Sequence, residues 1–221
     1  MHPTLKEMFD RLYAAYGPRH WWPGESPFEV LIGAVLVQNT SWQNAEKAID
    51  RLRRDDLLEP HALHAVPLEE LEELIRPAGY YRIKARRLCS LLRFLVERYN
   101  GSLEAMFQTG LADLREELLK IKGVGPETAD SILLYAGGLP VFVVDAYTHR
   151  VLARHGWIGF DADYYQTQDH FFSGLPQDAA LYNEYHALLV EVGKQHCRKQ
   201  PRCEGCPLAA MLPPGGPLEQ E

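Results

Sequence analysis

Residues 118–129 read LLKIKGVGPETA and predict a helix, a tight turn and a second helix. Glycine accepts positive φ without a Cβ clash and lets a phosphate reach bare backbone N–H groups. Val124 would plug the turn into the core, and Pro126 suits the first position of the second helix. A plain helix corner with a glycine C-cap is the alternative. The whole pattern favours a helix–hairpin–helix that binds a DNA backbone without reading bases, through Lys122, Gly123, Val124, Gly125 and Thr128.

Helical periodicity continues on both sides of this turn. Ser41 is a candidate N-cap, and the apolar run at 28–37 suits a buried helix. Residues 141–144 fit either a short strand or the buried start of a helix. The chain is therefore expected to be all-α, with a disordered tail at 212–221. The main helices are expected over residues 4–16, 28–37, 42–54, 82–99, 111–120, 127–136, 146–155, 164–173 and 178–195, with a short one after Pro67.

Composition indicates a globular chain whose charge is unevenly spread. The 221 residues include 23 lysines and arginines against 30 aspartates and glutamates, a net charge of −7 that argues against a histone-like nucleic-acid binder. No apolar run is long enough to span a membrane, and the N-terminus has no apolar signal core, so a cytoplasmic protein is expected. Basic residues nevertheless concentrate: residues 82–98 carry six against one glutamate, and residues 194–202 carry four with no acid.

Asp145 directly follows the apolar run at 141–144. An aspartate in this position commonly caps the next helix. A carboxylate at the edge of an apolar wall can also stabilise positive charge that develops at a sugar C1′, and it can orient an attacking water. The two roles are compatible, so Asp145 is the candidate catalytic residue.

The glycine turn, followed about 20 residues later by Val144-Asp145 and then Arg150, resembles the endonuclease III-like DNA glycosylases. The resemblance runs from Phe28 to Cys206. It implies a two-subdomain helix–hairpin–helix fold, with a DNA cleft between a central helical barrel and a domain formed by both termini. It also implies a monomer that binds double-stranded DNA containing damaged bases and that does not bind a membrane. The expected subdomains are 26–142, with the hairpin at 118–131, and 1–25 joined to 143–211, with a Cys-rich loop at 197–206.

Two further turns match turns that contact DNA in that family. Gln38, within Leu36-Val37-Gln38-Asn39-Thr40, is expected to fill the gap left by an extruded base, with Asn39 beside it. Tyr80, in the Gly79-Tyr80-Tyr81 turn, falls where a wedge residue would sit. Both turns are therefore candidate DNA-binding segments.

Glu127 is the main departure from the family pattern. Bifunctional members place a lysine there, and it forms a Schiff base with C1′. A glutamate cannot form this bond, and Lys120 and Lys122 precede the turn. The resemblance therefore implies a monofunctional enzyme without AP-lyase activity, in which Asp145 works with water and no cofactor is needed for the chemistry.

Three of the four tryptophans lie within 22 residues, flanking the buried run at 28–37. Each alone suits a core, but together they favour an aromatic slot for a flipped base. Trp21-Trp22-Pro23 and Trp42, with Glu127, resemble the 3-methyladenine DNA glycosylases of the endonuclease III type, in which an aromatic pair stacks the base. The expected substrate is an alkylated purine such as 3-methyladenine, whose positive charge suits aromatic faces. The alternatives are a glycosylase for oxidised or mismatched pyrimidines and a non-catalytic DNA-binding module.

Cys197, Cys203 and Cys206 lie within ten residues among basic side chains, which favours metal or cluster chemistry. The family uses Cys-x6-Cys-x2-Cys-x5-Cys to hold a [4Fe-4S] cluster. Here the first spacing is one residue shorter, and Leu212 stands at the fourth position. Three alternatives stay open: a cluster with a fourth ligand such as His196, a Zn²⁺ bound by three cysteines and a histidine, or a loop held by other contacts.

Overall fold

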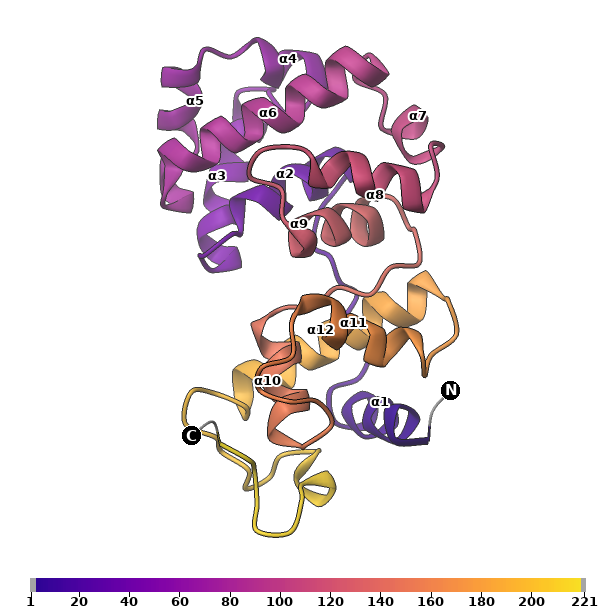
Figure 1. The fold of residues 1–221 in the computed structure, drawn as a ribbon. Coiled ribbons are helices and arrows are strands. Elements are labelled where there is room, and N and C mark those ends of the chain that lie inside the picture. The colour runs from indigo at the N-terminus through magenta and orange to yellow at the C-terminus, as the bar shows by residue number, and fades with distance from the viewer. Residues whose placement is uncertain (1–2, 220–221) are drawn as a thin grey trace. The chain divides into compact units, whose positions relative to one another are not determined.

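The computed structural model describes residues 3–219 as helices and connecting segments. Those residues contain no β-strand, which confirms the all-α prediction. The chain divides into two compact units, the central unit (residues 22–139) and the terminal unit (residues 1–21 and 140–221). Figure 1 labels the helices of both units.

The central unit is built around α2 (Pro27–Leu36), in which every residue after Pro27 is buried. Ser26 caps α2 by accepting a hydrogen bond from the Glu29 N–H at 3.2 Å. The buried Glu29 carboxylate lies 2.9 Å from the guanidinium of Arg53. Helices α3, α6 and α9 pack against α2. The surrounding helices are α3 (Trp42–Arg54), α4 (Pro60–Ala65), α5 (Leu68–Leu74), α6 (Tyr81–Tyr99), α7 (Leu103–Phe107), α8 (Leu111–Leu119) and α9 (Pro126–Ser131), with a 3-10 turn at Arg76–Ala78 and a π turn at Ile132–Ala136.

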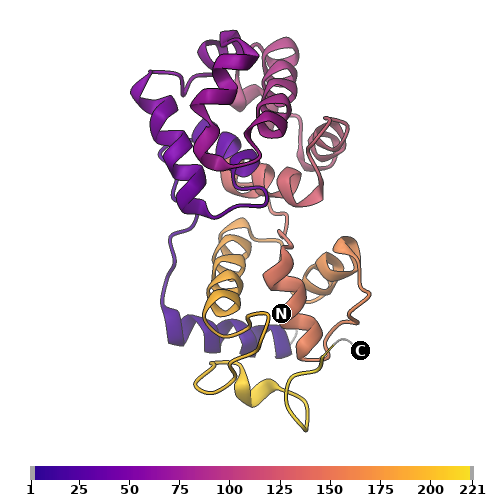
Figure 2. The ribbon, with the colours of Figure 1, turned by 90° about the vertical axis from the view of Figure 1, so that its left-hand side faces the viewer.

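The terminal unit brings the two ends of the chain together. Its helices are α1 (Pro3–Tyr16), α10 (Ala146–Arg154), α11 (Tyr164–Phe172) and α12 (Ala179–Gln195), with a 3-10 turn at Ala209–Met211. Helix α12 packs against both α10 and α1, so the indigo N-terminal helix lies beside the orange C-terminal one (Figures 1 and 2). Aromatic rings fill this core: Phe142 stacks on Phe171 with centroids 3.8 Å apart, and Tyr185 packs edge-on against both.

The apolar run at 141–144 forms neither a strand nor a helix. Its residues are buried and belong to no regular element. Side chains satisfy its backbone: Gln168 Nε2 donates to the Phe142 carbonyl at 2.6 Å, and the Val144 N–H lies 3.4 Å from the Tyr164 hydroxyl. The strand interpretation is therefore wrong, because side chains of α11 take the place of a partner strand.

The long helices lie where periodicity predicts them, within one or two residues. The helix expected over 127–136 is α9 followed by the π turn, in which the Gly137 N–H bonds to the Ile132 carbonyl at 3.1 Å. Ser41 precedes α3 but makes no side-chain cap bond. Helices α4 and α7 were not predicted, because both are too short to show periodicity. Their capping residues Glu59 and Ser102 were the available signal.

The expected disorder at 212–221 is wrong for residues 212–219, which the structure places. The Leu218 N–H donates to the Arg154 carbonyl at 2.9 Å, and the Leu218 side chain lies beside Gly156. This contact with α10 orders a segment whose Pro and Gly content predicts disorder. Residues 220 and 221 lie outside the described residues.

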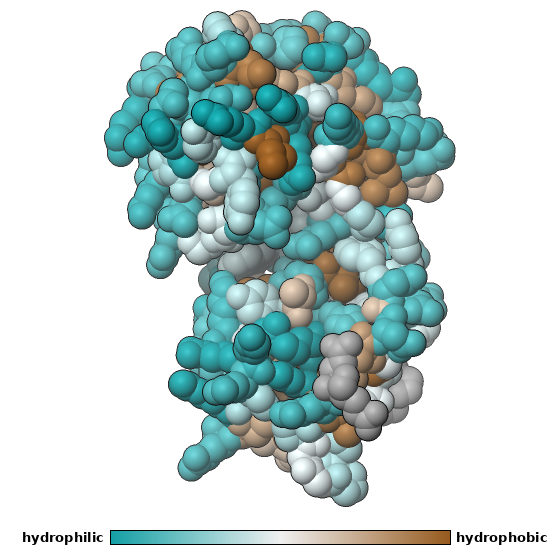
Figure 3. Space-filling model, turned by 60° about the vertical axis from the view of Figure 1, so that its left-hand side comes forward, coloured by the Kyte–Doolittle hydropathy of each residue, from teal (hydrophilic) through white to brown (hydrophobic). Residues whose placement is uncertain are grey.

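On the face drawn in Figure 3, hydrophilic residues cover most of the surface and hydrophobic residues form small separate spots. None of the helices within residues 3–219 combines the length and the apolar composition that crossing a membrane requires.

Candidate functional site

The glycine turn joins α8 to α9 in the central unit. Gly123 has a φ of +94°, and a Cβ there would lie 2.3 Å from Cγ of Arg87. Gly125 has a φ of −94°, and a Cβ there would meet no atom within 4 Å, so only Gly123 meets the expectation of positive φ. Val124 is 5% exposed, as expected for a residue that plugs the turn into the core. Gly123 is therefore required both by its conformation and by the close approach of Arg87.

The side chain of Gln38 is bound to this turn. Its Nε2 donates to the Gly123 carbonyl at 3.2 Å and to Thr128 Oγ1 at 2.8 Å. Arg87 Nη1 donates to Gln38 Oε1. The sequence pattern assigned Gln38, Gly123 and Thr128 separately to DNA contact, and the fold brings them into one hydrogen-bonded group. Arg87 was missed because nothing local marks it among the basic residues of α6.

Lys84 is a buried lysine that sequence reasoning also missed. Its side chain is almost fully buried, and Nζ donates to the Leu36 carbonyl at 2.9 Å and to the Ala78 carbonyl at 2.7 Å. The Leu36 carbonyl precedes the Gln38 turn and the Ala78 carbonyl precedes the Tyr80 turn. The Lys84 ammonium group therefore connects the two turns. Burial, with a smaller contribution from Arg87, lowers the pKa of Lys84 to about 8.

The remaining predicted DNA-contact residues lie on the surface. Tyr80 is 69% exposed at the start of α6, in the left-handed region with a φ of +47°. Asn39 is also in the left-handed region and exposed, and Lys122 is exposed as well. Ile83, which the sequence did not single out, is 51% exposed less than one helical turn after Tyr80. The Tyr80 turn therefore presents two large apolar side chains to its surroundings.

Trp22 and Trp42 meet in the central unit, against α2. Their ring centroids are 5.3 Å apart and the rings are perpendicular. Tyr135, which the sequence did not single out, lies 5.1 Å from Trp22 at an interplanar angle of 42°. Gly33 on α2 makes room for the two tryptophans, since a Cβ there would lie 3.3 Å from the Trp42 ring. Trp22 and Trp42 therefore pack edge to face, and the expectation that Trp42 and Trp21 or Trp22 stack a flipped base stays a prediction.

Trp21 belongs to the terminal unit, where Lys194 Nζ lies 5.6 Å from its ring centroid. Pro23 is exposed in the segment that leads to α2. Trp22 contacts Trp42 within the central unit.

Asp145 caps α10 in the terminal unit. Its Oδ1 accepts a hydrogen bond from the Thr148 N–H at 2.7 Å. Its Oδ2 lies 3.7 Å from Nε2 of His186 on α12, and both side chains are largely buried. Burial lowers the pKa of His186, and the neighbouring carboxylate offsets only part of this shift. Asp145 is thus a fixed carboxylate with a neutral imidazole beside it at neutral pH, and no local sequence pattern marks His186.

The hairpin helix carries no lysine at its exposed start. Glu127 is exposed in the first turn of α9. Lys120, before the turn, pairs with Glu116 at 2.8 Å. The hairpin therefore presents a carboxylate at the position where the resemblance expects a Schiff-base lysine in bifunctional enzymes.

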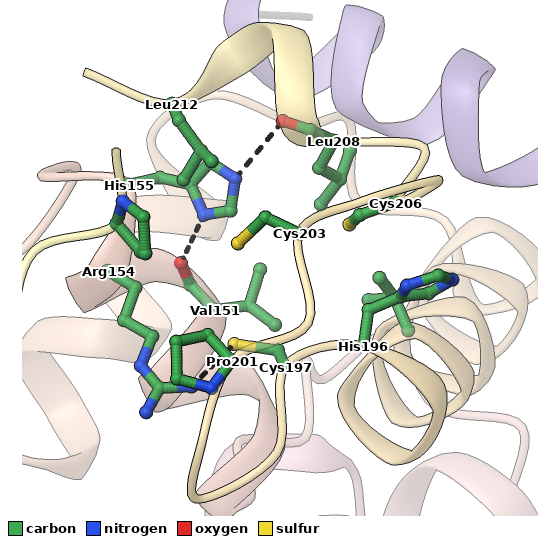
Figure 4. A pocket seen from close by; sticks show the side chains of 12 residues that line it. Val151, Arg154, His155, His196, Cys197, Pro201, Cys203, Cys206, Leu208 and Leu212 are labelled. Carbon is green, nitrogen blue, oxygen red and sulfur yellow. Dashed lines mark hydrogen bonds between the residues drawn. The ribbon is translucent and has the colours of Figure 1, made fainter. Parts of the chain in front are cut away.

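Cys197, Cys203 and Cys206 line one cavity of about 20 Å³ in the terminal unit (Figure 4). This volume has room for about one water molecule. Leu212 lines the same cavity at the fourth ligand position. His196 Nδ1 lies 3.0 Å from the Arg202 carbonyl, and in Figure 4 its ring extends away from the sulfur atoms. The residues present therefore do not fit a cluster held by four protein ligands.

A single metal ion fits no better. Within residues 3–219, no three or more His, Cys, Asp or Glu side chains are placed to hold one. The zinc alternative is therefore not supported.

The described residues are all helical, with a glycine hairpin and a capping aspartate that follows an apolar run. These features are typical of the helix–hairpin–helix class of DNA repair proteins. Residues 32–177 match the HhH-GPD superfamily of base excision DNA repair proteins. The chain belongs to this superfamily, and within it to the endonuclease III-like DNA glycosylases.

Individual relatives cover nearly the whole chain. A putative DNA repair glycosylase of Methanocaldococcus jannaschii is 49% identical over 208 residues, covering 91% of this chain and 94% of that protein. A trapped endonuclease III–DNA covalent intermediate superposes with a TM-score of 0.81 at 30% identity, covering 94% and 93%. The H. pylori 3-methyladenine DNA glycosylase MagIII bound to 1,N6-ethenoadenine gives a TM-score of 0.76 at 31% identity, covering 87% and 96%.

Replacing Gly123 by alanine is expected to lower the free energy of unfolding by about 1–3 kcal/mol, because alanine would be strained at this φ and would displace Arg87. Gly125→Ala is the matched control, since its φ is ordinary and its surroundings are open. Urea unfolding measures both variants. Equal stabilities of the two would contradict the assignment of Gly123 as the constrained residue.

The pH dependence of stability is expected to report the buried Lys84. Between pH 8 and the ordinary lysine value of 10.5, the unfolded chain binds more protons at this site than the folded protein does. Wild-type stability relative to Lys84→Met should therefore rise with pH across this window. Urea unfolding from pH 7 to 10 measures the difference, with exposed Lys47→Met as the control. A difference that stays constant with pH would contradict the shifted pKa.

Proposed function

We propose that this protein is a monofunctional DNA glycosylase that hydrolyses the N-glycosidic bond of a damaged base flipped out of double-stranded DNA. Its proposed substrates are alkylated purines such as 3-methyladenine. The observation that carries the proposal is the presence of the Asp145 carboxylate together with Glu127 in place of a Schiff-base lysine. A cytoplasmic location stays a prediction.

Asp145 would act on the sugar. One oxygen is held by the Thr148 N–H, which fixes the carboxylate at the start of α10. A fixed negative charge stabilises the positive charge that develops at C1′ as the bond to the base breaks. The same carboxylate can orient a water for attack on C1′. No covalent bond to the protein is needed in this route.

Trp22, Trp42 and Tyr135 would form the base pocket. Perpendicular rings offer one face for stacking and a second ring against the edge of the base. An N3-methylated adenine carries a positive charge, and each aromatic contact with a cation contributes roughly 0.5–2 kcal/mol. The likeness to an ethenoadenine-bound 3-methyladenine glycosylase supports this substrate class. Because the charged base leaves readily, the pocket needs to supply stacking more than acid catalysis.

A second candidate function is excision of oxidised or mismatched pyrimidines. The likeness to an endonuclease III trapped as a covalent DNA intermediate favours it, at an identity close to that of the 3-methyladenine enzyme. The two candidates share the fold, the hairpin and Asp145. They differ in the lesion released and in whether a lysine of the protein becomes bonded to the sugar.

A panel of duplexes that each carry one lesion tests both candidates. The panel contains 3-methyladenine, 1,N6-ethenoadenine, uracil, thymine glycol and a T·G mismatch, scored by released base and by alkali-labile sites. Release of alkylated purines is expected, and Asp145→Asn should reduce it about 100-fold or more. Asparagine still caps a helix, and Asp163→Asn, at the start of α11, is a matched capping control.

The outcomes of this experiment separate the candidate functions. Release of pyrimidines alone would favour the second candidate. No release from any lesion would favour a non-catalytic DNA-binding module, and full activity of Asp145→Asn would contradict the catalytic role of Asp145. Borohydride added to the same reactions should trap no protein–DNA adduct, and an adduct lost on mutation of a lysine would contradict the monofunctional route.

Trp42→Ala is expected to reduce excision of alkylated purines about tenfold, because it removes a stacking contact of roughly 1–2 kcal/mol. Binding to undamaged duplex should change little, since the hairpin is untouched. Single-turnover excision and fluorescence anisotropy measure the two quantities.

Trp42→Phe and Trp157→Ala serve as the controls. Phenylalanine retains an aromatic face and should restore most of the activity. Trp157 stacks on His155 in the terminal unit, so its loss should affect stability without a matching loss of excision. If the two alanine variants lost excision and stability in the same proportion, Trp42 would be a core residue only.

A further inference from the structure

The loop that carries the three cysteines is bound directly by the side chains of α10. Arg154, only 8% exposed, donates through Nη1 to the Arg198 carbonyl at 2.5 Å and through Nη2 to the Lys199 carbonyl at 2.8 Å. Its Nη1 also lies 3.5 Å from Cys197 Sγ. One buried guanidinium thus binds two successive carbonyls and touches the first cysteine.

Two further residues, Arg150 within α10 and His155 at its C-terminal end, hold the ends of the loop. Arg150 Nε donates to the Cys197 carbonyl at 2.6 Å. The two ring nitrogens of His155 lie 2.7 Å from the Val151 carbonyl and 3.3 Å from the Leu208 carbonyl. Figure 4 shows this histidine between the helix and the segment that follows Cys206. Helix α10 therefore contacts the loop at its start, along its first half and after its last cysteine.

The departure at the fourth ligand position, Leu212, lies in the wall of a small cavity. The cavity that the three cysteines line has a volume of about 20 Å³, and Leu212 lines it at the fourth ligand position. The segment beyond Leu212 is also tied to α10, through the Leu218 N–H and the Arg154 carbonyl. A four-iron cluster would have to displace an aliphatic wall and would still lack its fourth thiolate.

We infer that residues 197–212 fold and stay in place without an iron–sulfur cluster, because Arg154, with Arg150 and His155, binds the loop that a cluster would otherwise organise. Cys197, Cys203 and Cys206 are then unligated thiols that are dispensable for the structure of the loop. The protein is accordingly expected to keep its fold when iron is withheld.

Metal content and loop order test this inference together. The full chain is purified anaerobically from iron-supplemented cells and also treated with Fe²⁺ and sulfide under reducing conditions. Iron, acid-labile sulfide and absorbance near 400 nm are expected to stay near background. In a variant with all three cysteines replaced by serine, amide hydrogen exchange across residues 197–212 should match that of the parent. About four iron and four sulfide per chain, lost in the serine variant together with loop protection, would overturn the inference.

The role of Arg154 is tested separately by hydrogen exchange. Arg154→Met should speed exchange across residues 197–212 by about tenfold or more, since charge-assisted bonds to two carbonyls are lost. Arg86→Met, on the exposed side of α6, is the control. Because Arg154→Met removes a buried group, Arg154→Lys provides a milder variant, which keeps the charge but cannot bind both carbonyls in the same way and should show intermediate exchange. Unchanged loop exchange in both Arg154 variants would overturn the assignment of Arg154.

Discussion

The amide of Gln38 joins parts of the central unit that lie far apart in the chain. It bonds to the backbone of Gly123 and the hydroxyl of Thr128, 85 and 90 residues away, and it accepts a bond from Arg87. Arg87 can cross the hairpin only because Gly123 has no side chain. The absence of one Cβ therefore permits the contact that positions Gln38. Lys84, one turn earlier on α6, binds the carbonyl just before the same loop, so α6 organises the hairpin, the Gln38 turn and the Tyr80 turn together.

Helix α10 has a comparable role in the terminal unit. Its N-terminus is capped by Asp145, the proposed catalytic carboxylate, and its later turns and C-terminal end carry Arg150, Arg154 and His155. A displacement of α10 would move the carboxylate and the Cys-rich loop together. Contacts between α10 and the loop consequently help to fix the helix whose first residues hold Asp145. This coupling gives the loop a structural purpose that is independent of any metal.

The sequence predicts features that depend on neighbouring residues and misses those that depend on distant ones. The long helices and the buried Val124 follow from local periodicity and turn chemistry. Lys84 looks like any other basic residue of its stretch until the fold places the Leu36 carbonyl, 48 residues earlier, against its ammonium group. Tyr135 and His186 were missed for the same reason. Tyr135 packs against Trp22 and His186 lies beside Asp145, and both partners are far away in the sequence. The error over residues 212–219 has this origin too, since the contact with α10 outweighs the local preference of proline and glycine for disorder.

The same distinction changes the meaning of the basic stretch at 82–98. The sequence of this stretch contains six basic residues and one glutamate. In the structure, however, Lys84 is buried and donates to backbone carbonyls, and Arg98 pairs with Glu117 of α8. Arg82 lies 3.8 Å from Glu72 of α5. Burial thus removes one of these charges from the surface, and acidic neighbours in space lie close to two others. Salt-dependent affinity for undamaged DNA scales with the number of phosphates that free cations neutralise, so the folded protein should hold intact DNA more weakly than the sequence count implies. Under the proposed function, discrimination between damaged and undamaged DNA then has to come from the proposed base pocket at Trp22 and Trp42 and from the proposed catalytic Asp145.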